Sequence, residues 1–342
     1  MFLFYLVTAA IAFFAIRNIK SAIKSGSSGE WTPAIPADDG QKAGSGSPTA
    51  KSADTPKSAD TPKSADAPQK ADASRKAGTD APLKKAGTMQ KPAAAITYGL
   101  IGKPLGHSRS EILFRKKFLH EGISAEYLNF ELENAADIRQ LVEENPRIMG
   151  LNVTLPYKTG IMQYLDEIDE TARQIGAVNV IKVIRNDGRI WLKGYNTDHI
   201  GFERSLRPML QGRTVKALIL GTGGASKAVA YALSQMGIEY RFVSRTSSFD
   251  NLGYYELSPS IMEEYPLIVN CTPVGMHPDT DQCPDIPYAY ITADHILYDL
   301  VYNPETTLFM QKGMDHEASV KNGAEMLQIQ AEEAYRIWTE QN

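Results

Sequence analysis

The sequence predicts an α/β protein with two α/β domains that follow a long leading segment of a different character. From residue 96 onward, short apolar runs typical of buried strands alternate with apolar residues at helical spacing. A glycine-rich turn at residues 221–226 joins one such strand to one such helix. Residues 21–95 are dominated by Ser, Ala, Lys, Asp, Pro and Gly, a composition that cannot form a hydrophobic core.

The first 20 residues predict a membrane-anchor-like segment. Residues 1–16 carry no charged side chain, and Arg17, Lys20 and Lys24 follow them. At about 1.5 Å per residue, a helix of this kind reaches ~24–28 Å, which is marginal for a hydrocarbon core of ~30 Å. Positive charge after the apolar run favours the cytoplasmic side, so we expect the rest of the chain to be cytoplasmic. The alternative is that translation starts later, for example at Met89.

Residues 21–95 predict a disordered low-complexity linker. They contain a near-repeat that begins at Lys51, Lys57 and Lys63 and carries proline and mixed charge. Stacked structural repeats need apolar positions, which these residues lack, so a solenoid is not expected.

Charge and cysteine content exclude several classes of protein. The chain has 36 basic and 40 acidic residues and a formal net charge of −4, which is no electrostatic footprint for nucleic acid, so we expect no nucleic-acid partner. Its two cysteines, Cys271 and Cys283, match neither a disulfide framework nor the paired cysteines of a zinc site. No two of the six histidines have helical ligand spacing, so no metal is expected.

The residues before the glycine turn predict a βαβ series. The predicted elements are strands 97–101, 125–130 and 148–154 and helices 112–121 and 135–144. Ser108 and Ser110 lie in the turn before the first helix, where serines commonly act as N-caps. The segment from Leu155 to Lys158 leaves the third strand at its carboxyl end, where ligands of open α/β sheets bind.

The glycine turn lies between a predicted strand, 215–220, and a predicted helix, 225–236. Gly221 and Gly223 let the chain reverse, and they let a pyrophosphate approach the backbone N–H groups at the start of the helix. Ser226 replaces the third glycine of the dinucleotide-binding pattern. The alternative is an ordinary tight turn between a strand and a helix.

The next predicted strand, 240–243, ends in Ser244-Arg245-Thr246. A unit that binds NAD carries an acidic residue near this point, which holds the ribose 2′-hydroxyl. A guanidinium suits the 2′-phosphate of NADP instead, because it forms charge-assisted hydrogen bonds with it. Arg245 therefore predicts NADP, and the alternative is a solvated surface arginine.

Further motifs occur along the chain besides the glycine turn and Ser244-Arg245-Thr246. They are Gly102-x-Pro104-x-x-His107-Ser108-x-Ser110, Asn152-Val153-Thr154-x-Pro156-x-Lys158, Gly176-Ala177-Val178-Asn179, Gly194-x-Asn196-Thr197-Asp198-x-x-Gly201, Asn270-Cys271-Thr272-Pro273-Val274-Gly275-Met276, Tyr298-Asp299-Leu300-Val301-Tyr302-Asn303-Pro304 and Gly323-x-x-Met326-Leu327-x-x-Gln330. Through these motifs, the chain from Ile96 to the C-terminus resembles the shikimate dehydrogenases. Two positions depart from the family pattern: Glu111 stands where many members have proline, and Ser244 where asparagine often precedes the arginine.

The resemblance implies that Lys158 is the acid/base residue and Asp198 its partner. Hydride transfer to a ring ketone leaves an alkoxide, so a proton donor must lie beside the carbonyl oxygen. A lysine exchanges protons near neutral pH when it is partly desolvated, and a neighbouring carboxylate would hold its ammonium. Taken alone, Lys158 would be interpreted as a solvated lysine and Asp198 as an N-cap residue.

The resemblance also implies which residues surround the substrate and the cofactor. Ser108 and Ser110, with Tyr302 nearby, would hold the substrate carboxylate. Asn152, Thr154, Asn179 and Gln330 would bind the ring hydroxyls, although Asn179 alone would be interpreted as a turn cap and Gln330 as an exposed helix position. The implied cofactor-binding residues are Gly221, Thr222, Gly223, Gly224, Ala225, Ser226, Ser244, Arg245, Thr246, Thr272, Leu300 and Gly323.

These implications give the expected organisation and activity. Residues 96–198 and 323–342 would form the substrate-binding catalytic domain, and residues 199–322 a Rossmann-type NADP-binding domain, with the cleft between them. The expected activity is the reversible NADPH-dependent reduction of 3-dehydroshikimate to shikimate in aromatic amino-acid biosynthesis, by a monomer or homodimer. One alternative is an NAD-using quinate/shikimate dehydrogenase, against which Arg245 argues. The other is a non-catalytic membrane-tethered binding protein of the same fold, against which Lys158 and Asp198 argue.

Overall fold

The computed structural model describes residues 96–106 and 108–340. The predicted membrane-anchor-like segment and linker lie outside these residues, as does His107. Within the described part of the chain, no helix is both long enough and apolar enough to cross a membrane.

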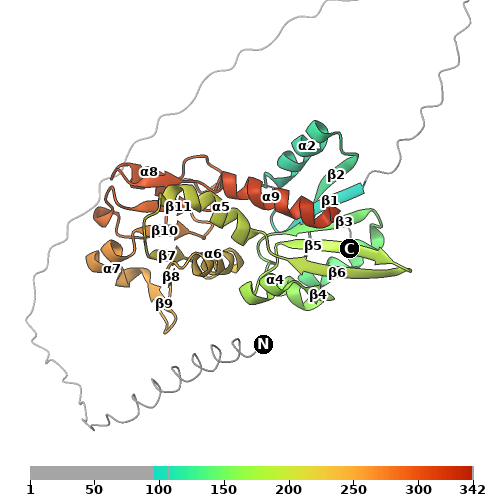
Figure 1. Ribbon diagram of the computed structural model, residues 1–342, viewed down its shortest axis with the longest axis horizontal. Coiled ribbons are helices and arrows are strands. Elements are labelled where there is room, and N and C mark those ends of the chain that lie inside the picture. The colour runs from blue at the N-terminus through green and yellow to red at the C-terminus, as the bar shows by residue number, and fades with distance from the viewer. Residues whose placement is uncertain (1–95, 107, 341–342) are drawn as a thin grey trace, which may run out of the picture. The chain divides into compact units, whose positions relative to one another are not determined.

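Residues 96–195 contain the six strands of the first sheet, which is mixed (Figure 1). These strands are β1 (Ile96–Gly102), β2 (Ala125–Glu131), β3 (Ile148–Val153), β4 (Glu167–Ile168), β5 (Val180–Asn186) and β6 (Arg189–Tyr195). Their order is β2-β1-β3-β5-β6-β4. The first three strands are parallel, whereas β5 runs antiparallel to β3 and β6.

The predicted βαβ series is confirmed by β1, β2 and β3 and by the helices between them. The helices of this region are α2 (Ser110–Glu121), α3 (Ile138–Glu144) and α4 (Glu170–Ile175), and a 3₁₀ turn at Ala135–Asp137 precedes α3. The β5–β6 hairpin was not predicted. It closes through Asp187 at φ 47° and Gly188 at φ 74°, the Asp-Gly pair that favours a two-residue hairpin turn.

The second sheet is entirely parallel and has the Rossmann strand order. Its strands are β7 (Ala217–Leu220), β8 (Tyr240–Ser244), β9 (Asn251–Gly253), β10 (Leu267–Asn270), β11 (Ile296–Asp299) and β12 (Ser319–Lys321). Their order is β12-β11-β10-β7-β8-β9, and every pair is parallel. The chain reverses its winding direction between β7 and β10, so ligands are expected where these two strands end.

Five helices accompany the second sheet. They are α5 (Asp198–Leu210), α6 (Gly224–Gln235), α7 (Pro259–Glu264), α8 (Leu308–Met314) and α9 (Ala324–Thr339). Helix α9 packs beside α5 (Figure 1) and places Met326 in the same core as Phe202 of α5. Near its other end, the indole Nε1 of Trp338 donates to the carbonyl oxygen of Ile181 in β5 at 3.1 Å.

Helix α9 therefore contacts β5 of the first sheet and also packs in the core of the second sheet. The domain boundaries at residues 198 and 323 stay a prediction, because α5 also packs in the core of the second sheet through Phe202 and Leu206.

Candidate active site

Lys158 and Asp198 form a partly buried ion pair. The Nζ of Lys158 lies 2.6 Å from Oδ2 of Asp198, and the two side chains are 15% and 6% exposed. Neither residue is therefore a solvated surface group. The lysine follows β3 and the aspartate begins α5, so the pair joins the carboxyl end of the first sheet to the first helix after it.

The carboxylate of Asp198 does not cap α5, so its interpretation as an N-cap residue is wrong. Oδ1 of Asn196 accepts hydrogen bonds from the backbone N–H groups of Asp198 at 3.0 Å and His199 at 3.4 Å. Because Asn196 satisfies the start of the helix, both oxygens of Asp198 are free for other partners. One accepts from Lys158, and the other accepts from Nδ2 of Asn179 at 2.8 Å.

The backbone around Lys158 is held on both sides. Its carbonyl oxygen accepts from the N–H of Val178 at 2.7 Å. The neighbouring Tyr157 is buried and donates its hydroxyl to the carbonyl oxygen of Leu132 at 2.5 Å. These bonds fix the turn after β3, so the lysine side chain starts from a defined position.

Asn179 is the centre of a buried polar network. Its Nδ2 contacts Oγ1 of Thr197 at 3.0 Å and Oε1 of Gln330 at 3.2 Å, in addition to Asp198. Its Oδ1 accepts from the backbone N–H of Thr197 at 2.7 Å. Asn179 is 2% and Gln330 8% exposed, so the alternative interpretation of Gln330 as an exposed helix position is wrong. Thr197 belongs to the same network, although the sequence analysis named it only within a motif and predicted no role for it.

A second buried group extends this polar surface. The hydroxyl of Tyr127 donates to Oδ1 of Asn152 at 2.8 Å, and Asn152 is 5% exposed. Burial raises the pKa of Tyr127 well above its usual range, and the adjacent Ser110 side chain lowers it by less. Tyr127 is therefore a neutral donor that orients Asn152. Its role was not predicted from the sequence, because a tyrosine in a strand is usually part of the core.

The turn before α2 brings Ser108 and Ser110 together. Oγ of Ser108 accepts from the backbone N–H of Ser110 at 3.2 Å, and neither hydroxyl caps α2, whose N-cap is Arg109. The guanidinium of Arg109, the residue between the two serines, lies 5.9 Å from the centre of the Tyr302 ring. Thr154 is half-buried at the end of β3, with its methyl group close to Gly102.

The glycine turn after β7 is a tight turn in which Gly221 has a backbone conformation that favours glycine. Gly221 has φ 102°, which other residues rarely adopt, and a Cβ there would lie 3.1 Å from Cγ2 of Thr272. Oγ1 of Thr272 donates to Oδ1 of Asn270 at 2.6 Å, which fixes the Thr272 side chain at the end of β10. Gly223 is exposed at the start of α6, where backbone N–H groups are available to an anion.

Gly224 lies directly against the candidate acid/base residue. A Cβ on Gly224 would stand 2.8 Å from Cβ of Lys158 and 3.5 Å from Cβ of Ala177. The glycine turn and the Lys158 turn are thus in van der Waals contact, which brings the predicted nucleotide and substrate residues to one place.

The remaining predicted cofactor residues differ in accessibility. Thr222 is exposed and Ala225 half-buried, whereas Ser226 is fully buried and its Oγ has no hydrogen-bond partner among the described residues. Gly323 permits a close backbone approach, since a Cβ there would overlap the carbonyl oxygen of Leu300.

The segment after β8 presents Arg245 to solvent. None of the ion pairs among the described residues includes Arg245, and Thr246 beside it is exposed. Ser244, by contrast, uses its hydroxyl within the turn, donating to the carbonyl oxygen of Thr246 at 2.5 Å. An unpaired guanidinium and an exposed hydroxyl at the end of the second Rossmann strand fit the 2′-phosphate of NADP.

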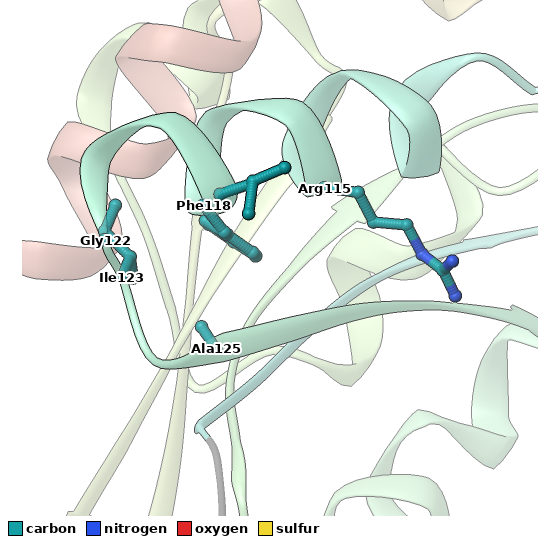
Figure 2. Close-up of a pocket in the computed structure, with 6 residues that line it drawn as sticks. Arg115, Phe118, Gly122, Ile123 and Ala125 are labelled. Carbon is teal, nitrogen blue, oxygen red and sulfur yellow. The ribbon is translucent and has the colours of Figure 1, made fainter.

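A hollow elsewhere on the first sheet lacks such chemistry. Figure 2 shows it between the end of α2 and the start of β2; it is lined by Arg115, Phe118, Leu119, Gly122, Ile123 and Ala125. Its one charged lining residue, Arg115, is already paired with Glu111 at 3.1 Å, and the other lining residues are apolar, so it is not a candidate active site. Within the described residues, no cluster of His, Cys, Asp and Glu could hold a metal ion.

Comparisons with known proteins agree with this geometry. The family model described as the shikimate dehydrogenase substrate binding domain matches residues 100–181. The shikimate dehydrogenase (NADP(+)) of Methanococcus maripaludis strain C6 is 37% identical over 260 residues, which cover 70% of this chain and 90% of that protein.

Two solved structures are also similar. The Thermus thermophilus shikimate 5-dehydrogenase in complex with NADP(H) and shikimate is 30% identical, with a TM-score of 0.63, over 71% of this chain and 93% of that one. The Corynebacterium glutamicum quinate dehydrogenase in complex with NAD is 25% identical, with a TM-score of 0.61, over 72% of this chain and 94% of that one. The sequence motifs, the Rossmann sheet, the Lys158–Asp198 pair and the identity to these relatives together show that this chain belongs to the shikimate dehydrogenase family.

Proposed function

We propose that this protein is an NADP-dependent shikimate dehydrogenase, which reduces 3-dehydroshikimate to shikimate and catalyses the reverse reaction. The observation that carries the proposal is the partly buried ion pair of Lys158 and Asp198, 2.6 Å apart, which lies against the glycine turn of a Rossmann sheet. A proton donor therefore lies where a nicotinamide and a small polar ring would meet.

NADPH, when bound, supplies the hydride. Lys158 donates a proton to the oxygen that becomes an alkoxide, and it accepts the proton back in the reverse direction. Asp198 holds the ammonium through Oδ2, while Asn179 holds Oδ1 of the carboxylate. Because the carboxylate is fixed at both oxygens, Nζ of Lys158 is directed before substrate arrives, which lowers the cost of orientation in the transition state.

The proposed substrate-binding residues form two sets, one for the ring hydroxyls and one for the carboxylate. Asn152, Thr154, Asn179 and Gln330 bind the ring hydroxyls, and Ser108, Ser110 and Tyr302 bind the carboxylate. Asn152, Asn179 and Gln330 are buried, so an analogue that lacks a hydroxyl leaves buried polar atoms unpaired and binds poorly.

The predicted preference for NADP is tested by measuring kcat/KM for 3-dehydroshikimate reduction with NADPH and with NADH. Loss of a charge-assisted phosphate pair costs on the order of 1.5–3 kcal/mol, or roughly 10- to 150-fold in affinity. Arg245→Ala should therefore weaken NADPH binding by roughly this factor while NADH binding changes little. Equal efficiency with both cofactors in the unmutated protein would favour the NAD-using alternative instead.

The domain assignment and the location of the enzyme belong to the same proposal. Residues 96–198 and 323–342 bind substrate, residues 199–322 bind NADP, and residues 1–20 tether a cytoplasmic enzyme to the membrane. The tether rests on the uncharged run at residues 1–16 and on the basic residues that follow it. Full-length protein should then sediment with membranes and be released by detergent; recovery in the soluble fraction after lysis would remove the tether from the proposal.

A further inference from the structure

The turn that carries Arg245 is held by a residue from the neighbouring strand. Nδ2 of Asn251, the first residue of β9, donates to Oγ of Ser244 at 2.8 Å and to the carbonyl oxygen of Thr246 at 2.6 Å. Both N–H groups of this amide are therefore used on the two residues that flank Arg245.

Ser248 sets the direction of the Asn251 amide. Its Oγ donates to Oδ1 of Asn251 at 2.5 Å, and its backbone N–H donates to the carbonyl oxygen of Asn251 at 2.9 Å. An amide whose oxygen accepts from Ser248 must point its NH₂ group away from it, toward Ser244 and Thr246. The chain from residue 244 to 251 thus closes on itself through the side chains of Ser248 and Asn251, neither of which was part of the predicted site.

This arrangement changes the role of Ser244. Its hydroxyl donates to the carbonyl oxygen of Thr246 and accepts from Asn251, so it has no further proton to give a ligand. The 2′-phosphate must then be bound mainly by the guanidinium of Arg245 and the exposed hydroxyl of Thr246. The positions of the guanidinium and of the Thr246 hydroxyl depend on the backbone of a short exposed turn. Asn251, in the neighbouring strand β9, is the side chain that holds this turn.

We propose that Asn251 is a positioning residue for Arg245 and thereby sets the preference for NADP over NAD. This inference rests on the proposed function in naming the cofactor, but it concerns binding rather than turnover. The amide does not itself reach the phosphate, because both of its donors are engaged. It acts by holding the residues before and after Arg245. The turn is then already ordered when the phosphate binds, so binding does not have to offset the entropy cost of ordering it.

The test measures the dissociation constants of NADP⁺ and NAD⁺ by calorimetry on the full-length protein. Asn251→Ala should weaken NADP⁺ binding about tenfold, the scale of one to two net hydrogen bonds, and leave NAD⁺ binding within about twofold. Asn251→Asp should weaken NADP⁺ binding further, because a carboxylate would face the Thr246 carbonyl oxygen and repel the phosphate. Equal losses for NADP⁺ and NAD⁺ would show that Asn251 only stabilises the fold, and would overturn the proposal.

Tyr255→Phe provides the matched control. The Tyr255 hydroxyl pairs with Oγ of Ser247 at 2.6 Å, so this variant removes one hydrogen bond from the same loop and keeps the ring. It should leave the ratio of the two dissociation constants unchanged within about twofold, and a loss equal to that of Asn251→Ala would mean that general loosening of the loop explains the effect.

A second comparison uses the Arg245→Ala background. If Asn251 acts through Arg245, Asn251→Ala should add little to the loss of NADP⁺ affinity that Arg245→Ala already causes, and full additivity would contradict the proposal. Activity and binding measured together distinguish failure of the proposed function from failure of this inference. An inactive wild-type protein would contradict the proposed function, whereas an unchanged NADP⁺ to NAD⁺ ratio in Asn251→Ala would contradict only this inference.

Discussion

Gly224→Ala should impair catalysis by displacing Lys158, although Gly224 lies in the nucleotide-binding turn. The new Cβ would stand 2.8 Å from Cβ of Lys158, whereas carbon atoms pack at about 3.5–4.0 Å, so one of them must move by roughly 1 Å. The clash is with the base of the lysine side chain, so a rotation about the outer bonds cannot relieve it. Two contacts limit how far the backbone can shift. The N–H of Val178 donates to the Lys158 carbonyl oxygen, and Cβ of Ala177 lies 3.5 Å from the new methyl group.

A misplacement of about 1 Å in a catalytic group can cost on the order of 10²-fold in rate. We therefore expect Gly224→Ala to lower kcat by roughly 10- to 100-fold in steady-state reduction of 3-dehydroshikimate. Gly223→Ala is the comparison, since it adds the same methyl group one residue earlier, where no atom lies within 4 Å. That variant should raise the dissociation constant of NADPH more than it lowers kcat. A Gly224→Ala enzyme whose kcat stays within twofold of the wild type would refute the reasoning.

Two further predictions concern carboxylates. Asp198→Asn should lower kcat and weaken substrate binding together, because an amide no longer holds the Lys158 ammonium as an ion pair; steady-state kinetics that show only a KM effect would count against this. Burial raises the pKa of Asp299 from its ordinary 3.8 to about 6, despite donors from Thr307, Val301 and Asn270. The native state therefore binds this proton more tightly than the unfolded state does, so protonation of Asp299 stabilises the fold. The stabilisation is complete below about pH 4 and is lost as the pH rises through about 6. Protonation of Asp299 contributes about 3 kcal/mol to the free energy of unfolding. In urea unfolding, wild type should therefore gain stability relative to Asp299→Asn as the pH falls from about 6 to about 4, and a difference independent of pH would contradict it.

Much of this fold could be predicted from local sequence patterns. The Rossmann unit around residues 215–246 combines a buried strand, a glycine turn and an amphipathic helix, and each of these has a strong local signal. Asp187-Gly188 is also a local signal, because an Asp-Gly pair favours the two-residue turn of the β5–β6 hairpin. The antiparallel pairing of β5 with β3 depends on tertiary packing, so no local pattern indicates it.

The candidate site was predicted less completely, for a physical reason. Motifs point to side chains that contact ligands, such as Lys158 and Arg245. They do not indicate residues that hold those side chains in place, because such residues are defined by contacts distant in sequence. Tyr127 lies 25 residues from Asn152, to which it donates. Asn196 was within a motif, but its capping role became clear only when its two backbone partners were visible.

The role of Lys158 is tested most directly by comparing Lys158→Ala with wild type for both turnover and cofactor binding. Wild-type protein should reduce 3-dehydroshikimate with NADPH, and Lys158→Ala should lower kcat by about two to four orders of magnitude, the usual scale of general acid/base catalysis, with the dissociation constant of NADPH nearly unchanged. A Lys158→Ala enzyme with an unchanged kcat would contradict the central claim that the Lys158–Asp198 pair carries the proton transfer.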